Sequence, residues 1–218
     1  MNQLDANPAM KIKTFAEPPG RTTVLSEDEL GRVLKAIDEI EDEHIRTAFH
    51  MLIQTGARKS EVLAAKWDDI DLEDRIWRIP SPKAGKPQVI PLPAEIAAML
   101  THLSREGDYI IPGRNPGEPR KDLRRPWLKI QTDAEIPHVT MHDIRRTFGL
   151  RITRKAGLHI ASKLLRHSDI RVTERHYAPL ELEELRGALE PGEAAPPSPK
   201  EQGRGRTGKV VNLRGRKR

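Results

Sequence analysis

The stretch Thr55-Gly56-Ala57-Arg58-Lys59-Ser60-Glu61-Val62-Leu63 joins two predicted helices through a tight turn. Apolar residues at helical spacing predict the first helix over about residues 43–54. Gly56 is typical of a helix stop, because glycine adopts the left-handed backbone conformation at little cost. The second helix is predicted over about residues 59–65. This turn therefore places a charged segment at the start of a helix.

Arg58 and Glu61 lie three residues apart in that segment, so their side chains share one helical face. Such a geometry lets the carboxylate orient the guanidinium. On spacing alone, however, an ordinary surface ion pair is the favoured interpretation, since such pairs are common and stabilise little.

Outward from this turn, the pattern is mainly helical with one small sheet. Ser26 and Glu29 form a capping-box pattern that opens an earlier helix. Two short strands are predicted at about residues 76–79 and 89–92, on either side of a turn rich in Pro, Gly and Lys. Further helices are predicted at about 94–103, at about 121–134, and from Thr140 to Leu189 with breaks near Gly157, Ser168 and Pro179.

The two ends of the chain differ from its middle. Residues 1–21 form a polar lead-in without the apolar segment of a signal peptide. Residues 190–218 are rich in Pro, Gly, Lys and Arg, and we expect them to be a disordered basic tail. Lys200–Arg218 hold eight Lys or Arg and one acid, a net +7, so the rest of the chain carries −1 of the total +6. The basic balance thus belongs to the tail.

Several functional classes are excluded or disfavoured by composition. The 218-residue chain has no cysteine, which excludes disulfides, a catalytic thiolate and cysteine-based zinc sites. No apolar run approaches the ~18 residues of a membrane span. The nucleotide-binding pattern GxxxxGK[ST] is absent, and no carboxylate cluster has the spacing of a two-metal nuclease.

His142 and Arg145 lie three residues apart on one face of a predicted helix. Such a pair makes sense if an anion sits between the two side chains. Arg offers a planar fork to phosphate oxygens, and His adds a proton donor or acceptor. A solvated helix face explains the pair equally well.

Tyr177 is one of two tyrosines in the chain and lies in a polar, basic stretch, although a tyrosine packed at a helix edge fits as well. Lys83 lies in the turn between the predicted strands, where a lysine is usually just solvated but can also reach a substrate. Together these residues suit phosphoryl transfer without a metal. Cations neutralise the transition state, a nucleophile attacks, and a proton donor assists the leaving oxygen.

In this order, the segments resemble the tyrosine recombinase, or phage integrase, family over about residues 22–188. Residues 55–61 resemble the family's first arginine box, and residues 67–71 resemble the stretch that follows it. Lys83, which precedes residues 89–92, resembles the family's hairpin lysine, and residues 142–145 resemble its His-x-x-Arg box. Leu165-Arg166-His167 resembles its Leu-Gly-His motif, and residues 173–177 resemble the segment that carries its nucleophile.

The resemblance implies a mainly α (α+β) fold, a helical catalytic domain over residues 22–189 with a small antiparallel β-sheet. It implies a site-specific DNA recombinase, an integrase that cuts and rejoins double-stranded DNA through a 3′-phosphotyrosyl intermediate. The bond energy is kept in that intermediate, so no ATP, metal, other cofactor or small-molecule substrate is expected. The resemblance further implies that the protein is encoded by a bacterium or phage and is cytoplasmic and nucleoid-associated. It also implies that the protein assembles as a homo-oligomer (tetramer) on DNA.

The same resemblance assigns roles to individual residues. Tyr177 attacks the scissile phosphate and frees a 5′-hydroxyl, while Lys83 protonates the leaving oxygen and His142 acts as a general acid or base near the tyrosine. Arg58 and Arg145 bind the non-bridging oxygens, and His167 helps to hold the phosphate. Glu61 orients Arg58, and Arg166 and Lys86 are expected to contact DNA.

Two departures from the family pattern leave alternatives open. Arg166 stands where the family usually has Gly, so it either strains the turn or adds a phosphate contact. Residues 7–13 look like the linker that follows the family's N-terminal clamp domain, so we expect the chain to start at that linker. The alternatives are a truncated DNA-binding or assembly module with little recombination activity, and a type IB topoisomerase-like activity that nicks and relaxes DNA.

Overall fold

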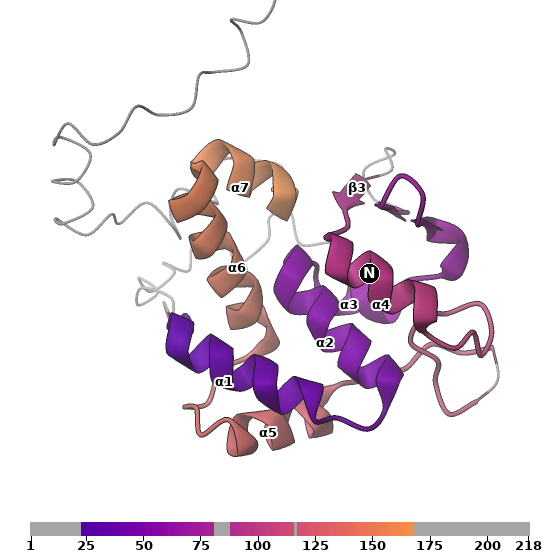
Figure 1. Ribbon diagram of the computed structural model, residues 1–218, viewed down its shortest axis with the longest axis horizontal. Coiled ribbons are helices and arrows are strands. Elements are labelled where there is room, and N and C mark those ends of the chain that lie inside the picture. The colour runs from indigo at the N-terminus through magenta and orange to yellow at the C-terminus, as the bar shows by residue number, and fades with distance from the viewer. Residues whose placement is uncertain (1–22, 81–87, 116, 168–218) are drawn as a thin grey trace, which may run out of the picture. The chain divides into compact units, whose positions relative to one another are not determined.

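Helices surround one central helix in the computed structural model, which describes residues 23–80, 88–115 and 117–167 (Figure 1). The elements, in chain order, are α1 (Glu27–Asp38), α2 (Glu43–Thr55), α3 (Lys59–Leu63), the 3-10 helix η2 (Trp67–Asp69), β1 (Ile70–Asp71), β2 (Ile76–Ile79), β3 (Gln88–Pro91), α4 (Ala94–His102), α5 (Arg124–Asp133), α6 (Met141–Ala156) and α7 (Leu158–Leu165). The predicted mainly helical fold with a small antiparallel sheet is confirmed.

Helix α2 is the central helix, and most of its residues are buried. It packs against α1, α3, α4 and α6, which accounts for burial on nearly every side. Its Phe49 ring lies 5.8 Å from that of Trp127 on α5, between ring centroids. Because α2 is fixed by its neighbours on several sides, its C-terminal end is a rigid platform for the residues that follow.

The sequence predicted how α1 begins and how α2 ends, and both predictions are confirmed. Ser26 accepts a hydrogen bond from the backbone N–H of Glu29, and the Glu29 side chain accepts one from that of Ser26, so the box that opens α1 is complete. At the end of α2, Gly56 adopts the left-handed conformation with φ of 63°. Both ends fall within a residue or two of the sequence-based boundaries.

The sheet has one more strand than the sequence indicated. Strands β1, β2 and β3 form an antiparallel sheet in that order, with Trp77 paired with Ile90 between β2 and β3. Only β2 and β3 were predicted. The two-residue β1 is too short to show an alternating pattern, and its position is given by pairing of Ile70 with Trp77.

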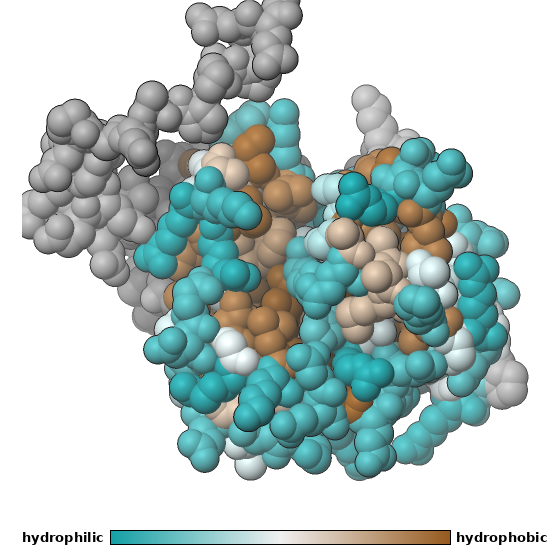
Figure 2. All heavy atoms as spheres, viewed as in Figure 1, coloured by the Kyte–Doolittle hydropathy of each residue, from teal (hydrophilic) through white to brown (hydrophobic). Residues whose placement is uncertain are grey.

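Helices α6 and α7 pack against each other and hold a small apolar cluster of their own, centred on Phe148 and Leu165. Between α2 and α6, apolar side chains reach the surface, and Ile53, Phe148 and Ile152 line a groove there (Figure 2). Gly157 separates the two helices, as expected. The breaks predicted near Ser168 and Pro179, and the helix predicted beyond α7, lie outside the described residues. Within the described ranges, no helix has the length and apolar character needed to cross a bilayer.

Candidate active site

The turn after α2 delivers Arg58 to the site, and Gly56 makes that turn possible. A Cβ atom on Gly56 would lie 2.3 Å from Cδ1 of Phe148, in addition to the strain of its positive φ. Any other residue type at this position would force the Phe148 side chain to shift. Arg58 then takes an extended conformation as the N-cap of α3. Its side chain remains 48% exposed.

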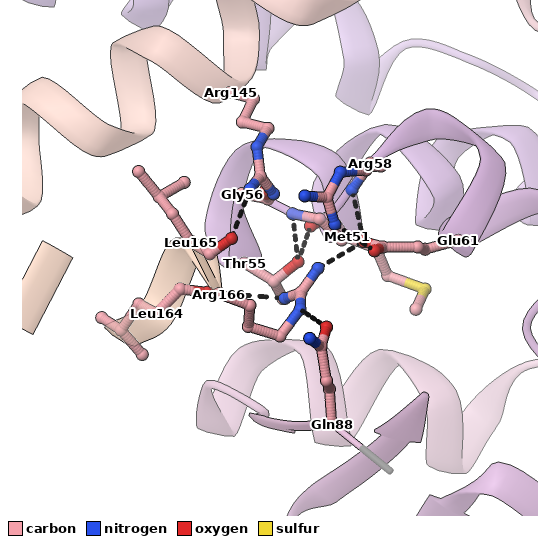
Figure 3. A network of polar contacts seen from close by, with 11 residues as sticks. Met51, Thr55, Gly56, Arg58, Glu61, Gln88, Arg145, Leu164, Leu165 and Arg166 are labelled. Atoms are coloured by element: carbon pink, nitrogen blue, oxygen red, sulfur yellow. Dashed lines mark hydrogen bonds and ion pairs between the residues drawn. The ribbon is translucent and has the colours of Figure 1, made fainter. Parts of the chain in front are cut away.

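Glu61 holds Arg58 through both the backbone and the side chain. The Arg58 backbone N–H donates to Oε2 of Glu61 at 2.7 Å, and Arg58 Nη1 donates to Oε1 at 2.7 Å (Figure 3). The Glu61 side chain is only 13% exposed. The pair that the spacing indicated is therefore present, but only its arginine lies at the surface. This carboxylate is largely buried and fixes the direction of the arginine.

The charge of Glu61 is stabilised by its surroundings. Burial raises the pKa of this carboxyl, but the Arg58 backbone N–H, the charge of Arg166 and the Arg58 side chain together lower it below the ordinary value. Glu61 is therefore ionised at neutral pH, as an ion-pair partner for arginine must be.

Arg145 lies on α6 and is 4% exposed. Its Nη1 donates to the carbonyl oxygen of Gly56 at 2.5 Å, and its Nη2 donates to that of Leu165 (Figure 3). These carbonyls lie at the ends of α2 and α7. Charge-assisted hydrogen bonds of this kind are among the stronger ones in proteins, so Arg145 is held in one orientation.

A cleft of about 580 Å³ brings together Arg58, His142 and Arg145. His142 lies in the first turn of α6 and is exposed. Thr140 caps this helix with Asp143 in a second complete capping box, which fixes where the helix begins and hence where His142 and Arg145 lie. Trp127 and Leu128 supply part of the apolar wall. The His142–Arg145 pair therefore lines a shared cleft with Arg58, and the cleft can receive an anion.

Arg166 ends α7 in the left-handed conformation, with φ of 54° and ψ of 43°. In this chain, the position where the family usually has glycine therefore has a left-handed backbone conformation. The Arg166 side chain is 5% exposed and forms an ion pair with Glu61. Its Nε donates to Oε1 of Gln88 at 3.1 Å. Arg166 does not line the cleft that holds Arg58 and Arg145, and its direct DNA contact stays a prediction.

His167 follows Arg166 and lines a second hollow of about 570 Å³ with Gln88, Lys163 and Arg166. Its backbone N–H donates to the carbonyl oxygen of Ser162 at 3.2 Å, which extends the cap of α7. Lys83, Lys86 and Tyr177 lie outside the described residues, so their roles remain predictions from the sequence.

Sequence reasoning missed two members of this site. Gln88, at the start of β3, binds Arg166, and no local pattern marks a glutamine for that role. Lys59, next to Arg58, pairs with Asp122 at 3.1 Å on the rim of the cleft. The Thr140–Asp143 box was detectable, because Thr followed three residues later by an acid precedes an apolar helix face.

Known proteins share this sequence pattern and fold. A family model described as "Phage integrase family" matches residues 23–184. The tyrosine recombinase XerA of Thermococcus kodakarensis is 27% identical over 190 residues, covering 84% of this chain and 67% of that protein. The prophage integrase IntF of Escherichia coli K12 is 26% identical over 174 residues, covering 74% and 36%.

Among solved structures, the crystal structure of XerA recombinase superimposes with a TM-score of 0.66 at 25% identity, covering 79% of this chain and 65% of that one. The chain belongs to the phage integrase family. It spans between 36% and 67% of the length of the two curated relatives named above.

Proposed function

We propose that this chain carries the catalytic domain of a site-specific DNA recombinase. One observation carries the proposal: Arg58 and Arg145, which come from different helices, line one cleft with His142. Both guanidiniums are oriented before any ligand arrives, Arg58 by Glu61 and Arg145 by two carbonyls. Oriented donors of this kind stabilise charge that develops on a phosphate in the transition state, with no cost of reorganisation during the reaction.

In the proposed reaction, the Tyr177 hydroxyl loses its proton and its oxygen attacks the scissile phosphorus. A tyrosine–phosphorus bond forms as the bond from phosphorus to the 5′-oxygen breaks. Lys83 gives a proton to that leaving oxygen, while His142 takes the tyrosine proton. Arg58, Arg145 and His167 bind the non-bridging oxygens. Rejoining runs the same steps in reverse, with a new 5′-hydroxyl as the nucleophile.

A suicide substrate tests this proposal. Double-stranded DNA with a nick beside the scissile phosphate loses its 5′-hydroxyl fragment after cleavage, so the covalent adduct accumulates. We expect an adduct that migrates with the protein on a denaturing gel and persists in a metal chelator. Tyr177→Phe removes the nucleophile and should abolish the adduct. Tyr109→Phe changes the other tyrosine, beside Lys66 away from the cleft, and should leave the adduct intact.

The same experiment separates the alternatives. Binding of DNA without any adduct, at high protein concentration, would favour a DNA-binding or assembly module. Loss of supercoils without recombinant junctions would favour the topoisomerase-like activity. The proposal also includes assembly of a homo-oligomer (tetramer) on DNA in the cytoplasm, close to the nucleoid. Sedimentation of the protein with and without its DNA site tests the assembly.

A further inference from the structure

Arg166 occupies a backbone conformation that disfavours it. A residue with a Cβ atom is disfavoured in the left-handed region, because the Cβ atom comes too close to the following carbonyl oxygen, and glycine largely avoids this cost. Arg166 has φ of 54°, yet its side chain is turned inward and is 5% exposed. A long cation held in a strained position and buried within the protein points to a role for the side chain itself.

The Arg166 side chain bonds to residues of three elements, α3, β3 and α7. Nη2 of Arg166 binds Oε2 of Glu61 on α3, Nε binds Gln88 at the start of β3, and Nη1 donates at 3.4 Å to the carbonyl oxygen of Leu164 on α7 (Figure 3). Glu61 therefore has a guanidinium on each oxygen. The Arg58 side chain binds Oε1, and Arg166 shares Oε2 with the Arg58 backbone N–H.

This division of Glu61 determines how Arg58 is presented. A lone arginine opposite a carboxylate tends to bind both oxygens with two parallel hydrogen bonds. Here Oε2 of Glu61 accepts from both Nη2 of Arg166 and the Arg58 backbone N–H, so the Arg58 side chain is limited to one ion-pair contact, with Oε1 at 2.7 Å. The rest of its guanidinium lies in the cleft, and the side chain is 48% exposed. The mutual repulsion of the two cations acts in the same direction, because it opposes closer approach of Arg58 to Glu61.

We propose that Arg166 is a positioning residue, which acts through Glu61 to hold the Arg58 guanidinium in the cleft. It does not itself touch the phosphate. The catalytic consequence rests on the proposed function, whereas the effect on Arg58 does not.

The principal variant is Arg166→Gly, because glycine suits the left-handed backbone and the variant should fold. Arg75→Gly is the matched control. Arg75 has φ of 52° and is exposed in the turn before β2, so this change also removes one cation from a strained position. Adduct formation with the nicked substrate is measured at saturating protein. We expect Arg166→Gly to slow it by about tenfold to a hundredfold, the scale of a misplaced catalytic group. Arg75→Gly should not change the rate.

DNA affinity separates positioning from contact. If Arg166 acts through Glu61, the slope of log Kobs against log[salt] is the same in Arg166→Gly as in the parent. A slope smaller in magnitude by about 0.9 would indicate a lost phosphate contact and would overturn the proposal. Combining Arg166→Gly with Glu61→Gln should slow cleavage no more than Glu61→Gln alone. Additive losses would contradict action through Glu61. Arg166→Lys, which keeps a cation opposite Glu61, should restore part of the rate.

A readout without DNA keeps this inference separate from the proposed function. Nitrogen NMR of the arginine side chains reports how freely the Arg58 guanidinium rotates and what it binds. Arg166→Gly should shift the Arg58 signals and change their rotation rate, while Arg75→Gly should not. Unchanged Arg58 signals in Arg166→Gly would overturn the inference, whatever the activity. If the parent protein forms no adduct but the Arg58 signals respond as expected, only the proposed function fails.

Discussion

Replacing Gly56 with alanine should destabilise the protein and disturb both arginines of the cleft. The new Cβ would stand at φ of 63° and 2.3 Å from Cδ1 of Phe148. The left-handed conformation costs about 1–2 kcal/mol for alanine. Forcing the Phe148 ring to shift adds about 1–3 kcal/mol, as overpacking of a core does. Together they lower the free energy of unfolding by about 2–5 kcal/mol.

Urea denaturation followed by circular dichroism measures this loss directly. For a protein of this size, the corresponding fall in Tm is about 2–4 °C for each kcal/mol. Gly31→Ala is the matched control. Gly31 lies within α1, and no atom stands within 4 Å of the Cβ that alanine would add. That change should stabilise the protein by about 0.5–1 kcal/mol, because glycine is unfavourable inside a helix.

The two contributions at Gly56 can be separated. In a Phe148→Ala background no side-chain atom beyond Cβ remains to meet the new methyl group, so Gly56→Ala should cost only the backbone part, roughly half of its cost in the parent. If Gly56→Ala proves as harmless as Gly31→Ala, the turn relaxes without cost and the argument that Gly56 positions the site is refuted. A full penalty retained in the Phe148→Ala background would refute the contribution of the ring contact alone.

Three further outcomes are expected. Arg145→Ala leaves two buried carbonyl groups without their donor, so the free energy of unfolding should fall by about 3 kcal/mol in urea titration, and adduct formation should cease. Glu61 has a folded-state pKa below its ordinary value of 4.5, so its stabilising contribution is present above that pH and disappears as the pH falls through the lower folded value. Glu61→Gln should therefore flatten the loss of stability in acid, and an unchanged acid profile would count against the ion-pair network. Deleting Lys200–Arg218 should weaken DNA binding and lower its salt dependence in fluorescence anisotropy, and an equal slope would show that the tail does not bind phosphates.

Local patterns predicted much of the fold because its elements are defined locally. The box at Ser26 and the stop at Gly56 each depend on a few neighbouring residues, and both are found as expected. The pairing of Arg58 with Glu61 was also readable from spacing, although its burial was not. Burial depends on the packing of α7, which lies about a hundred residues further along the chain.

Long-range contacts explain what the sequence did not show. The bonds from Arg166 to Gln88 and to Glu61 span 78 and 105 residues. Nothing near any of these residues indicates such a pairing. Strand β1 was missed for a related reason, since its two residues acquire their conformation from β2.

The bonds from Arg145 to Gly56 and Leu165 join residues 89 and 20 positions apart. Closing a loop of that larger size costs about 4 kcal/mol of chain entropy, and this cost is met during folding. The N-terminal half expressed alone would hold Arg58 and Glu61 without Arg166, and the C-terminal half would hold Arg145 without the Gly56 carbonyl. The anion-binding arrangement is thus a property of the completed tertiary structure, and recovery of phosphate affinity can serve as a marker for the last stage of refolding.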